Sequence, residues 1–345
     1  MSFLRNAWYM IAWSTEIGNE PFSRRILDIP IVLYRHDGEL VALANRCPHR
    51  FAPLSKGQVV DGNIQCPYHG LQFDRHGTCV ANPFSSVAPS AAKVRPFPVH
   101  DVHGTVWIWM GDPDVADPAA IPVIAHHADD GIEKVSGLTL ARADYRLLSD
   151  NLMDLTHTAF LHPALGGRDY VPKVRTWEDD GDIVAEFLIA DMPNFFGEEV
   201  IPGPTVRHRD TIRWHAPSVH VLNSQTSRAG SDDPVVQIPS AHILTPETAN
   251  TTHYFWSSGV PTGFEPGMMR EVLMQAFDQE DKPMVEAVQE MMEGQELWDL
   301  NPVLLASDAG GVRMRRKLVA LIEAEQQLTG GVVPVNPGAC AHAQR

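Results

Sequence analysis

Cys47-Pro48-His49, followed after sixteen residues by Cys66-Pro67-Tyr68-His69, is the stretch that decides how the first third of this chain folds. Each segment offers one thiolate and one imidazole. Four such ligands could hold a tetrahedral zinc ion, or a [2Fe–2S] cluster with two cysteines on one iron and two histidines on the other. The C-x-H spacing is tighter than that of most zinc sites, the two prolines stiffen both segments, and Gly70 permits a tight turn. These details favour the cluster.

The residues around the two segments indicate an all-β domain. Apolar runs at 31–34 and 40–44 are separated by His36-Asp37-Gly38, which is typical of a hairpin, and another strand is expected at 106–110. Residues 111–122 contain three prolines and three aspartates, as a linker does. We therefore expect a first domain over residues 1–115 and a second over 116–345.

Composition excludes several classes of protein. The chain has 345 residues, 44% of them hydrophobic, and a formal net charge of −16, which disfavours nucleic-acid binding. No segment approaches the ~20 apolar residues that span a bilayer, and the N-terminus lacks the features of a signal peptide, so no membrane association and a cytoplasmic location are expected. Cys79 and Cys340 have no matching histidines, and we interpret them as ordinary buried or surface residues.

The second domain mixes helices and strands, so the fold class is α+β. Helices are expected at 145–161, ending before Pro163, at 267–292 and at 311–326, with short strands over 176–260. No internal repeat is present.

Two histidines five residues apart, His157 and His162, lie near the end of the first of these helices. On an ideal helix these positions diverge by about 140°, so one metal could bind both only if the helix is distorted there, for example by a π-bulge. Two histidines and one carboxylate form the facial triad of non-haem Fe(II) oxygenases. Asp281 is the candidate carboxylate because it lies on an apolar helical stripe, where an unpaired acid is costly. Periodicity leaves Glu280, Asp278 and a plain surface acidic run open.

Several segments together resemble one family. CPHR (47–50) and CPYHG (66–70) are similar to the signature of Rieske proteins. NLMDLTHTAFLH (151–162), RNAWYMIAW (5–13), ILTPET (243–248) and SDAGGVRMRR (307–316) extend the resemblance over nearly the whole chain, to Rieske non-haem iron oxygenases of the vanillate O-demethylase and dicamba monooxygenase type. The implied fold is an all-β Rieske [2Fe–2S] domain plus a catalytic domain with an antiparallel sheet flanked by helices.

The resemblance also implies roles for particular residues. Cys47 and Cys66 would bind the inner iron of the cluster, and His49 and His69 the outer iron. His157, His162 and Asp281 would bind a mononuclear Fe(II). Asp154 would bridge the two centres by accepting hydrogen bonds from His157 and from His69 of a neighbouring subunit, and Asn151, one turn earlier, would support the site.

The implied enzyme is a monooxygenase that uses O2 and externally supplied electrons. Because no GxGxxG segment follows a strand, a separate reductase or ferredoxin should deliver them. The family usually forms a head-to-tail homotrimer. A pure electron-transfer protein is disfavoured by residues 151–162, and a zinc-stabilised binding module by the cluster motif.

The substrate implied by the resemblance is a small aromatic compound, with O-demethylation of a methoxy-aromatic acid as the expected reaction. The alternatives are methyl or ring hydroxylation, cis-dihydroxylation and N-demethylation. The sequence departs from its relatives between about 190 and 240, where loops that shape pockets are expected. Four residues from the strands expected between 210 and 256 are candidates for substrate binding: His220, Asn223, His242 and Trp256.

Overall fold

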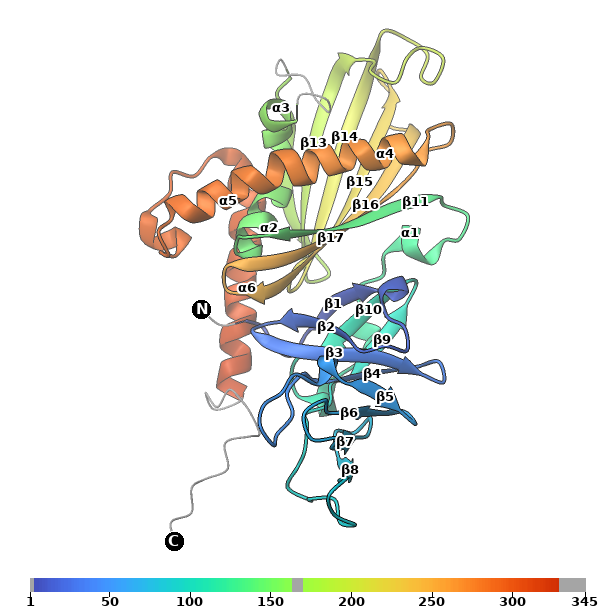
Figure 1. Ribbon diagram of the computed structural model, residues 1–345. Helices are drawn as coiled ribbons and strands as arrows, with labels where there is room; N and C mark the ends of the chain where they lie inside the picture. Colours follow the sequence, from blue (N-terminus) through green and yellow to red (C-terminus); the bar gives the residue numbers. More distant parts are fainter. Residues whose placement is uncertain (1–2, 163–169, 329–345) are drawn as a thin grey trace. The chain divides into compact units, whose positions relative to one another are not determined.

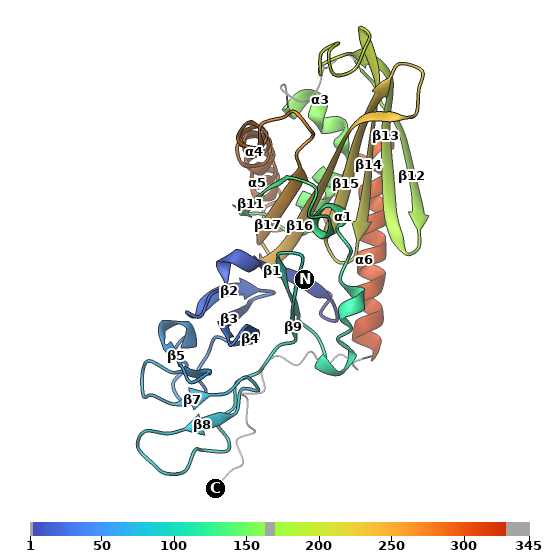
Figure 2. The ribbon, with the colours of Figure 1, turned by 90° about the vertical axis from the view of Figure 1, so that its right-hand side faces the viewer.

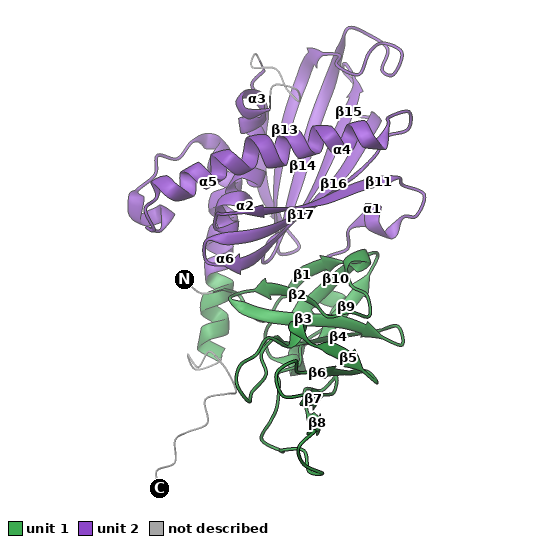
Figure 3. Cartoon of the chain, viewed as in Figure 1, with its two compact units in different colours: residues 1–121, 320–345 green, residues 122–319 purple. Residues whose placement is uncertain are grey.

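The computed structural model describes residues 3–162 and 170–328, which belong to two compact units (Figure 3). The first unit comprises Met1–Ile121 and Ala320–Arg345, and the second Pro122–Val319. Within the proline-rich linker, Asp112 and Asp117 each cap a short 3-10 turn that begins with proline. Pro163, which was expected to end a helix, and Cys340, which was interpreted as an ordinary residue, lie outside the described residues.

Strands and 3-10 turns build residues 3–121, as expected for an all-β domain. Three small antiparallel sheets have the strand orders β1-β10-β9, β2-β3-β4 and β5-β6-β7-β8. The predicted hairpin is confirmed: β3 and β4 pair through His36 and Glu39, and Asp37 and Gly38 take the positive φ angles that a two-residue turn needs. The strands are β1 (Trp8–Trp13), β2 (Phe22–Ile26), β3 (Ile29–His36), β4 (Glu39–Ala44), β5 (Gln58–Val60), β6 (Asn63–Gln65), β7 (Gln72–Phe73), β8 (Cys79–Ala81), β9 (Val99–Val102) and β10 (Thr105–Trp109).

The second unit is built on one seven-stranded antiparallel sheet of order β11-β17-β16-β15-β14-β13-β12 (Figures 1 and 2). Its long strands run over the region where short strands were expected, and β11 was not predicted. The bounds are β11 (Lys134–Ala141), β12 (Lys173–Asp179), β13 (Asp182–Pro193), β14 (Thr205–His215), β15 (Val219–Arg228), β16 (Pro234–Thr248) and β17 (Thr251–Gly259). The predicted α+β class, with an antiparallel sheet flanked by helices, is confirmed.

Helices α4 and α5 cross one face of this sheet end to end, joined by a π-helical segment (Figure 1). The α-helices of the described residues are α1 (Ala125–Ala128), α2 (Tyr145–Met153), α3 (Thr158–Leu161), α4 (Pro266–Met274), α5 (Lys282–Met291) and α6 (Ala309–Leu328). The predicted helices at 267–292 and 311–326 are therefore present. The prediction of one continuous helix over 145–161 is wrong. Helix α2 ends at Met153, and a 3-10 turn and the short helix α3 follow it. Among the described residues, no helix is both long and apolar enough to cross a membrane.

Helix α6 is tied to α2 by a pair of charged side chains. The Arg315 guanidinium is buried and donates to both carboxylate oxygens of Asp150, with Nε–O distances of 2.8 Å. A Cβ atom on Gly310 would lie 3.0 Å from the main-chain oxygen of Met153, so a larger residue would push the helices apart. This contact supports α2, which leads into the predicted metal ligands.

Candidate functional site

Two loops of the first unit present the predicted cluster ligands, and both loops close in the same way. The Cys47 N–H donates to the Ala52 carbonyl at 2.9 Å, and the Cys66 N–H donates to the Leu71 carbonyl at 2.8 Å. Four residues after each cysteine, Phe51 and Gly70 have φ angles of 61° and 72°. The glycine expected to allow a tight turn therefore does so, and the first loop adopts the same geometry with a phenylalanine.

The side chains of these loops fit a cluster better than a single zinc ion. Cys47 and Cys66 are buried, while the His49 and His69 rings lie nearer the surface with centroids 4.5 Å apart. A tetrahedral zinc ion would need the ligand atoms of these residues to lie within a few ångströms of one another. No three of the four ligand atoms lie within 4.8 Å of one another, whereas three ligand atoms in the second unit do so within the described residues. A two-iron cluster spreads the same ligands further apart.

Two further observations indicate that this site is built for a bound group. The Nδ1 atom of His69 is buried and has no hydrogen-bond partner in the described part of the chain, which is unusual unless a metal occupies that place. Burial raises the pKa of the Cys47 thiol to about 11. The backbone N–H of His49 lowers this pKa in part, and the neighbouring Cys66 thiol raises it further. Buried thiols of this kind release their protons when they bind a metal ion.

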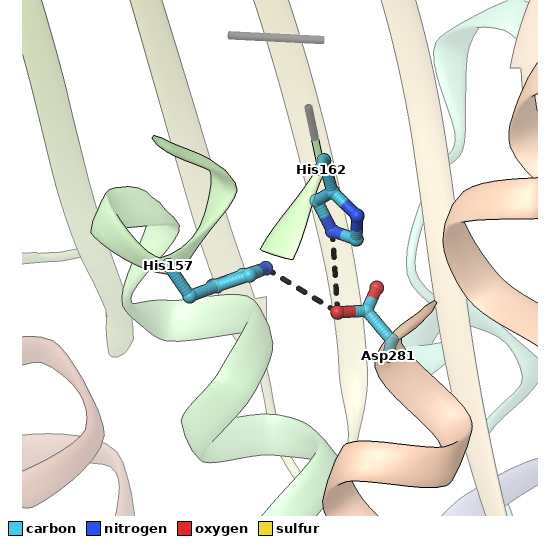
Figure 4. Close-up of side chains that lie close together, drawn as sticks. All are labelled: His157, His162 and Asp281. Atoms are coloured by element: carbon cyan, nitrogen blue, oxygen red, sulfur yellow. Dashed lines mark ion pairs between the residues drawn. The ribbon is translucent and has the colours of Figure 1, made fainter. Parts of the chain in front are cut away.

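The group that does converge is in the second unit, where His157, His162 and Asp281 point toward one another (Figure 4). Asp281 Oδ1 lies 3.4 Å from His157 Nε2 and 3.2 Å from His162 Nε2. Metal–ligand bonds of ~2.1 Å at right angles place neighbouring donors ~3.0 Å apart. The two His–Asp distances are therefore close to those between neighbouring ligands in a facial triad, and all three donor atoms lie within 4.8 Å of one another.

The chain departs from α-helical geometry just before His157 and again at His162, at the two ends of the short helix that joins them. Helix α2 ends at Met153, and Asp154 (φ −128°, ψ 89°) leads into a 3-10 turn, Leu155–His157, before α3. The departure is thus a 3-10 turn that ends at His157, and α3 between the two histidines contains no π-bulge. A π-helical segment does occur, over Gln275–Asp281, on the helix that carries the carboxylate.

Asp278, Glu280 and Asp281 were the candidates for the third ligand, and the structure gives their side chains three different sets of partners. Asp281 is buried and faces both histidines. Glu280 accepts from Nδ1 of His162 at 2.7 Å, and Asp278 accepts from the Thr139 hydroxyl. Burial alone would raise the pKa of Asp281, but hydrogen bonds from His157 and His162 outweigh it and lower the pKa. The Asp281 carboxylate is therefore charged, as a metal ligand must be.

The remaining ring nitrogen of each histidine has a fixed acceptor. Nδ1 of His157 lies 2.5 Å from the main-chain oxygen of Asp154, and Nδ1 of His162 lies 2.7 Å from Glu280. An Nδ1–H donated in this way leaves the Nε2 lone pair for a metal and holds the ring in place. Asn151 donates from Nδ2 to Asp281 Oδ1 at 3.1 Å, so it steadies the carboxylate.

Replacing Glu280 tests this orientation. The Glu280→Ala variant is expected to bind the mononuclear iron about 10- to 100-fold more weakly, because His162 loses the acceptor that selects its tautomer. Iron retention against a competing chelator measures the effect. Glu280→Gln is the matched control: it keeps an acceptor oxygen without the charge and should retain more of the affinity. Unchanged iron affinity in the alanine variant would contradict the assignment.

Asp154 occupies a different position from the one expected. Its carboxylate Oδ1 accepts from the Thr156 N–H at 2.9 Å and from the Thr156 hydroxyl at 2.6 Å. The expected hydrogen bond from His157 goes to the main-chain carbonyl of Asp154 and not to its carboxylate. The carboxylate is therefore a cap for the 3-10 turn, and its Oδ2 has no hydrogen-bond partner among the residues that the structure describes.

A cavity of about 240 Å³ opens beside the three converging residues and is lined mostly by apolar side chains. Of the four residues predicted to bind substrate, His242 lines it. The His242 side chain is buried, its Nδ1 lies 2.7 Å from the Tyr254 hydroxyl, and its Nε2 has no partner in the described residues. Burial lowers the pKa of His242 to about 4, so the ring is neutral. With the Tyr254 hydroxyl donating to Nδ1, the Nε2–H is a free donor.

The other three predicted residues are not on the cavity wall. Asn223 alternates with the lining residues Leu222 and Ser224 along β15, so it points to the opposite face of the sheet. His220 is fully buried and does not line the cavity, and Trp256 packs against Phe277 at a centroid distance of 5.5 Å.

Sequence reasoning missed the polar residues that do line the cavity on β14 and β15. These are His208, Asp210, Ser224 and Thr226. It also missed the aromatic wall, which consists of Phe187, Phe195, Phe196 and Phe277. On β14, residues 208, 210 and 212 are spaced two apart, and so are residues 222, 224 and 226 on β15. This period of two is a signal that could have placed each set on one face of its strand.

Two family models match the chain. Residues 7–98 match the Rieske [2Fe-2S] domain, and residues 141–324 match the vanillate O-demethylase oxygenase C-terminal domain. The dicamba O-demethylase oxygenase component of Stenotrophomonas maltophilia is 38% identical, over 94% of this chain and 99% of that protein. The chloroacetanilide N-alkylformylase oxygenase component of Rhizorhabdus wittichii is 36% identical, over 94% and 97%.

A solved structure agrees with these matches. The crystal structure of dicamba monooxygenase with non-heme iron and dicamba has a TM-score of 0.82 at 36% identity, covering 95% of this chain and 100% of that one. A Rieske domain joined to a sheet-and-helix domain defines a class of oxidoreductase, the oxygenase components that act on O2 with electrons supplied from outside. This chain belongs to the Rieske non-haem iron oxygenases, in the family of the dicamba and vanillate O-demethylase oxygenase components.

Proposed function

We propose that this protein removes the methyl group from an aryl methyl ether, with O2 and electrons from a partner reductase or ferredoxin. The observation that carries the proposal is the apolar cavity with two histidines and a buried carboxylate on its wall, in a chain 38% identical to a dicamba O-demethylase oxygenase component. A methoxy-aromatic acid is the substrate that the resemblance implies.

We assign the metal ligands to the residues described above. Cys47 and Cys66 would bind the inner iron of the cluster and His49 and His69 the outer iron, within a domain spanning residues 1–115. His157, His162 and Asp281 would bind the mononuclear iron, within a domain spanning 116–345. When bound, this iron would supply the open positions at which O2 chemistry takes place.

The residues around the cavity hold the substrate and keep water out. Phenylalanine and aliphatic side chains form most of the wall, so a ring binds by apolar contact. The Nε2–H of His242 can donate to an acceptor on the ring, such as a carboxylate or carbonyl oxygen. Together these contacts would direct the methyl group toward the triad.

The overall reaction balances without a further co-reactant. One O2, two electrons and two protons convert the ether methyl to a hydroxymethyl group and release one water. The resulting hemiacetal breaks its C–O bond, and its hydroxyl proton passes to the departing phenolate. The products are a phenol and formaldehyde.

The assembly is proposed from the resemblance to the family and not from a feature of this chain. We propose a head-to-tail homotrimer in which Asp154 of one subunit approaches His69 of the next. A heterologous ring of this kind is a closed assembly. The free Oδ2 of Asp154 is compatible with such a contact. No role for nucleic acid or membrane is proposed, and a cytoplasmic location stays a prediction.

Formaldehyde release tests the reaction. We would supply the purified protein with NADH and a generic reductase and offer methoxy- and methyl-substituted benzoates, phenols and N-methyl heterocycles. Formaldehyde equal to the O2 consumed, with a phenol as co-product, is the expected result for a methoxyarene. O2 uptake with a hydroxylated product and no formaldehyde would overturn demethylation while keeping the oxygenase class.

N-dealkylation is the second candidate. The relative from Rhizorhabdus wittichii, named for an N-alkyl substrate, is 36% identical over 94% of this chain, almost as similar as the O-demethylase. The same hydroxylation at an N-linked carbon would release an aldehyde and an amine or amide. Identification of the co-product as an amide rather than a phenol would favour this candidate.

A further inference from the structure

A cluster of four polar side chains on the cavity wall has no part in the triad. Asp210 and His208 lie on β14, and Ser224 and Thr226 face them from β15. Ser224 donates to Asp210 Oδ1 at 2.5 Å, and His208 Nε2 lies 3.1 Å from Asp210 Oδ2. The other ring nitrogen of His208 lies 2.8 Å from the Thr226 hydroxyl. The Asp210 carboxylate is therefore held from two sides.

The strand register places this cluster away from the triad. Asp210 pairs with Ser224, which pairs with Ile238, four residues before His242 on β16. The Cα atoms of Asp210 and His242 are thus separated by about 13 Å along the strands and about 10 Å across them. The His242 ring contacts Phe277, four residues before Asp281, at a centroid distance of 5.3 Å. His242 therefore marks the triad side of the cavity, and Asp210 marks the far side.

On the cavity wall, His208 is the residue that pairs with the negative charge of Asp210. No lysine or arginine is among the lining residues that the structure describes. Arg207 and Arg209 alternate with the lining residues and pair with Asp232 at 3.0 and 2.6 Å on the other face of the sheet. Burial would lower the pKa of His208, but the Asp210 carboxylate outweighs it and raises the pKa, which favours a protonated ring beside a charged carboxylate.

The carboxylate still has capacity to accept. Each carboxylate oxygen carries two lone pairs, and each Asp210 oxygen uses one of them within the cluster. The side chain is 21% exposed and lines the cavity, so a ligand can reach the remaining lone pairs. A second carboxylate placed there would meet a negative charge without a free cation. A neutral N–H or O–H group would meet an acceptor.

We propose that Asp210, positioned by His208 and Ser224, is a specificity-determining residue that accepts a hydrogen bond from a neutral donor on the substrate. The donor is a phenolic hydroxyl or ring amino group at the end of the molecule away from the reacting methyl. His242 then holds an acceptor on the triad side. This assignment rests on the proposed function for the ring and its methyl group, but the anchor itself can be measured without turnover.

Calorimetric binding of paired ligands tests the anchor. The pairs are 3- and 4-methoxyphenol, each compared with the dimethoxybenzene in which the hydroxyl is methylated and the donor is lost. Neither member carries a carboxylate. The wild-type protein is expected to bind each methoxyphenol about 10- to 100-fold more tightly, because a hydrogen bond to a charged acceptor is among the stronger ones. Equal affinity for the two members of each pair would overturn the proposal.

Two variants locate the preference. The double variant His208→Leu/Asp210→Leu removes the pair without leaving a lone charge and should bind both members of each pair equally. Its affinity for the dimethoxybenzene reports whether the cavity is intact. If that affinity is lost, Asp210→Asn carries the test, since it keeps the shape and removes the charge; the preference should fall at least about 5-fold. A preference unchanged in the variant that retains the cavity overturns the proposal.

The outcomes separate the anchor from the reaction. Formaldehyde release from methoxyarenes by a protein that shows no donor preference would leave the demethylase intact and remove the anchor. A donor preference that disappears with Asp210, in a protein that releases no formaldehyde, would confirm the anchor and refute the reaction.

Discussion

The His162→Ala variant is expected to lose substrate oxidation by more than about 100-fold while keeping the colour of its cluster. Loss of a residue that only orients a metal ligand costs up to about that factor, and His162 is proposed as a ligand itself. Its Nε2 lies 3.2 Å from Asp281 Oδ1, and alanine leaves His157 and Asp281 as two donors on one side of the site. Two donors hold a divalent ion far less firmly than three.

Iron analysis and visible absorption measure this result separately from activity. The wild-type protein should hold about three irons per chain, two in the cluster and one at the triad, and the variant about two. His215→Ala is the matched control, since His215 also pairs with a carboxylate, Asp182, at 2.9 Å, but lies off the cavity. It should keep all three irons and its activity. A His162→Ala protein with three irons or normal turnover would remove His162 from the metal site.

The Asp154→Ala variant is expected to retain both kinds of iron and yet oxidise substrate more than about 100-fold more slowly. In the proposed trimer its carboxylate would connect the two centres across a subunit boundary, and no proposed metal ligand is changed. Single-turnover mixing of the reduced protein with O2 and substrate measures the effect as slow reoxidation of the cluster. Reoxidation at the wild-type rate would contradict the proposed role.

The structure supplies a control that separates charge from capping. Asp154 Oδ1 holds the Thr156 N–H at the start of the turn that carries His157, and loss of such a cap costs about 1 kcal/mol. Asp154→Asn keeps an oxygen for this cap and removes the charge. Slow turnover in both variants is expected. Recovery of turnover in the asparagine variant alone would mean that Asp154 acts by holding the turn.

The local parts of both metal sites could be predicted from the sequence. Cys47 and His49, and Cys66 and His69, each lie within four residues of one another, and short hydrogen-bonded loops present them. His157 and His162 lie in one twelve-residue segment, and their five-residue spacing already required a distorted helix. Such features depend on backbone geometry over one or two turns, which a sequence pattern can express.

The choice of carboxylate depended on tertiary structure. Asp278, Glu280 and Asp281 lie within four residues, and α-helical periodicity could not separate them. The π-helical segment over Gln275–Asp281 changes the angle between successive side chains, so an α-helical projection does not describe their directions. Asp281 faces the histidines because α4, α5 and α2 pack on one face of the sheet, far apart in sequence.

The sequence by itself determined the class of protein, the two cofactor motifs and the domain order, because these rest on short segments whose chemistry is local. The tertiary structure decided which face of β14, β15 and β16 became the cavity wall. Alternation along a strand divides residues into two sets, but it does not say which set the helices cover. Packing of α4 and the π-helical segment over one face made Asp210 and His242 line the cavity and placed Asn223 outside it.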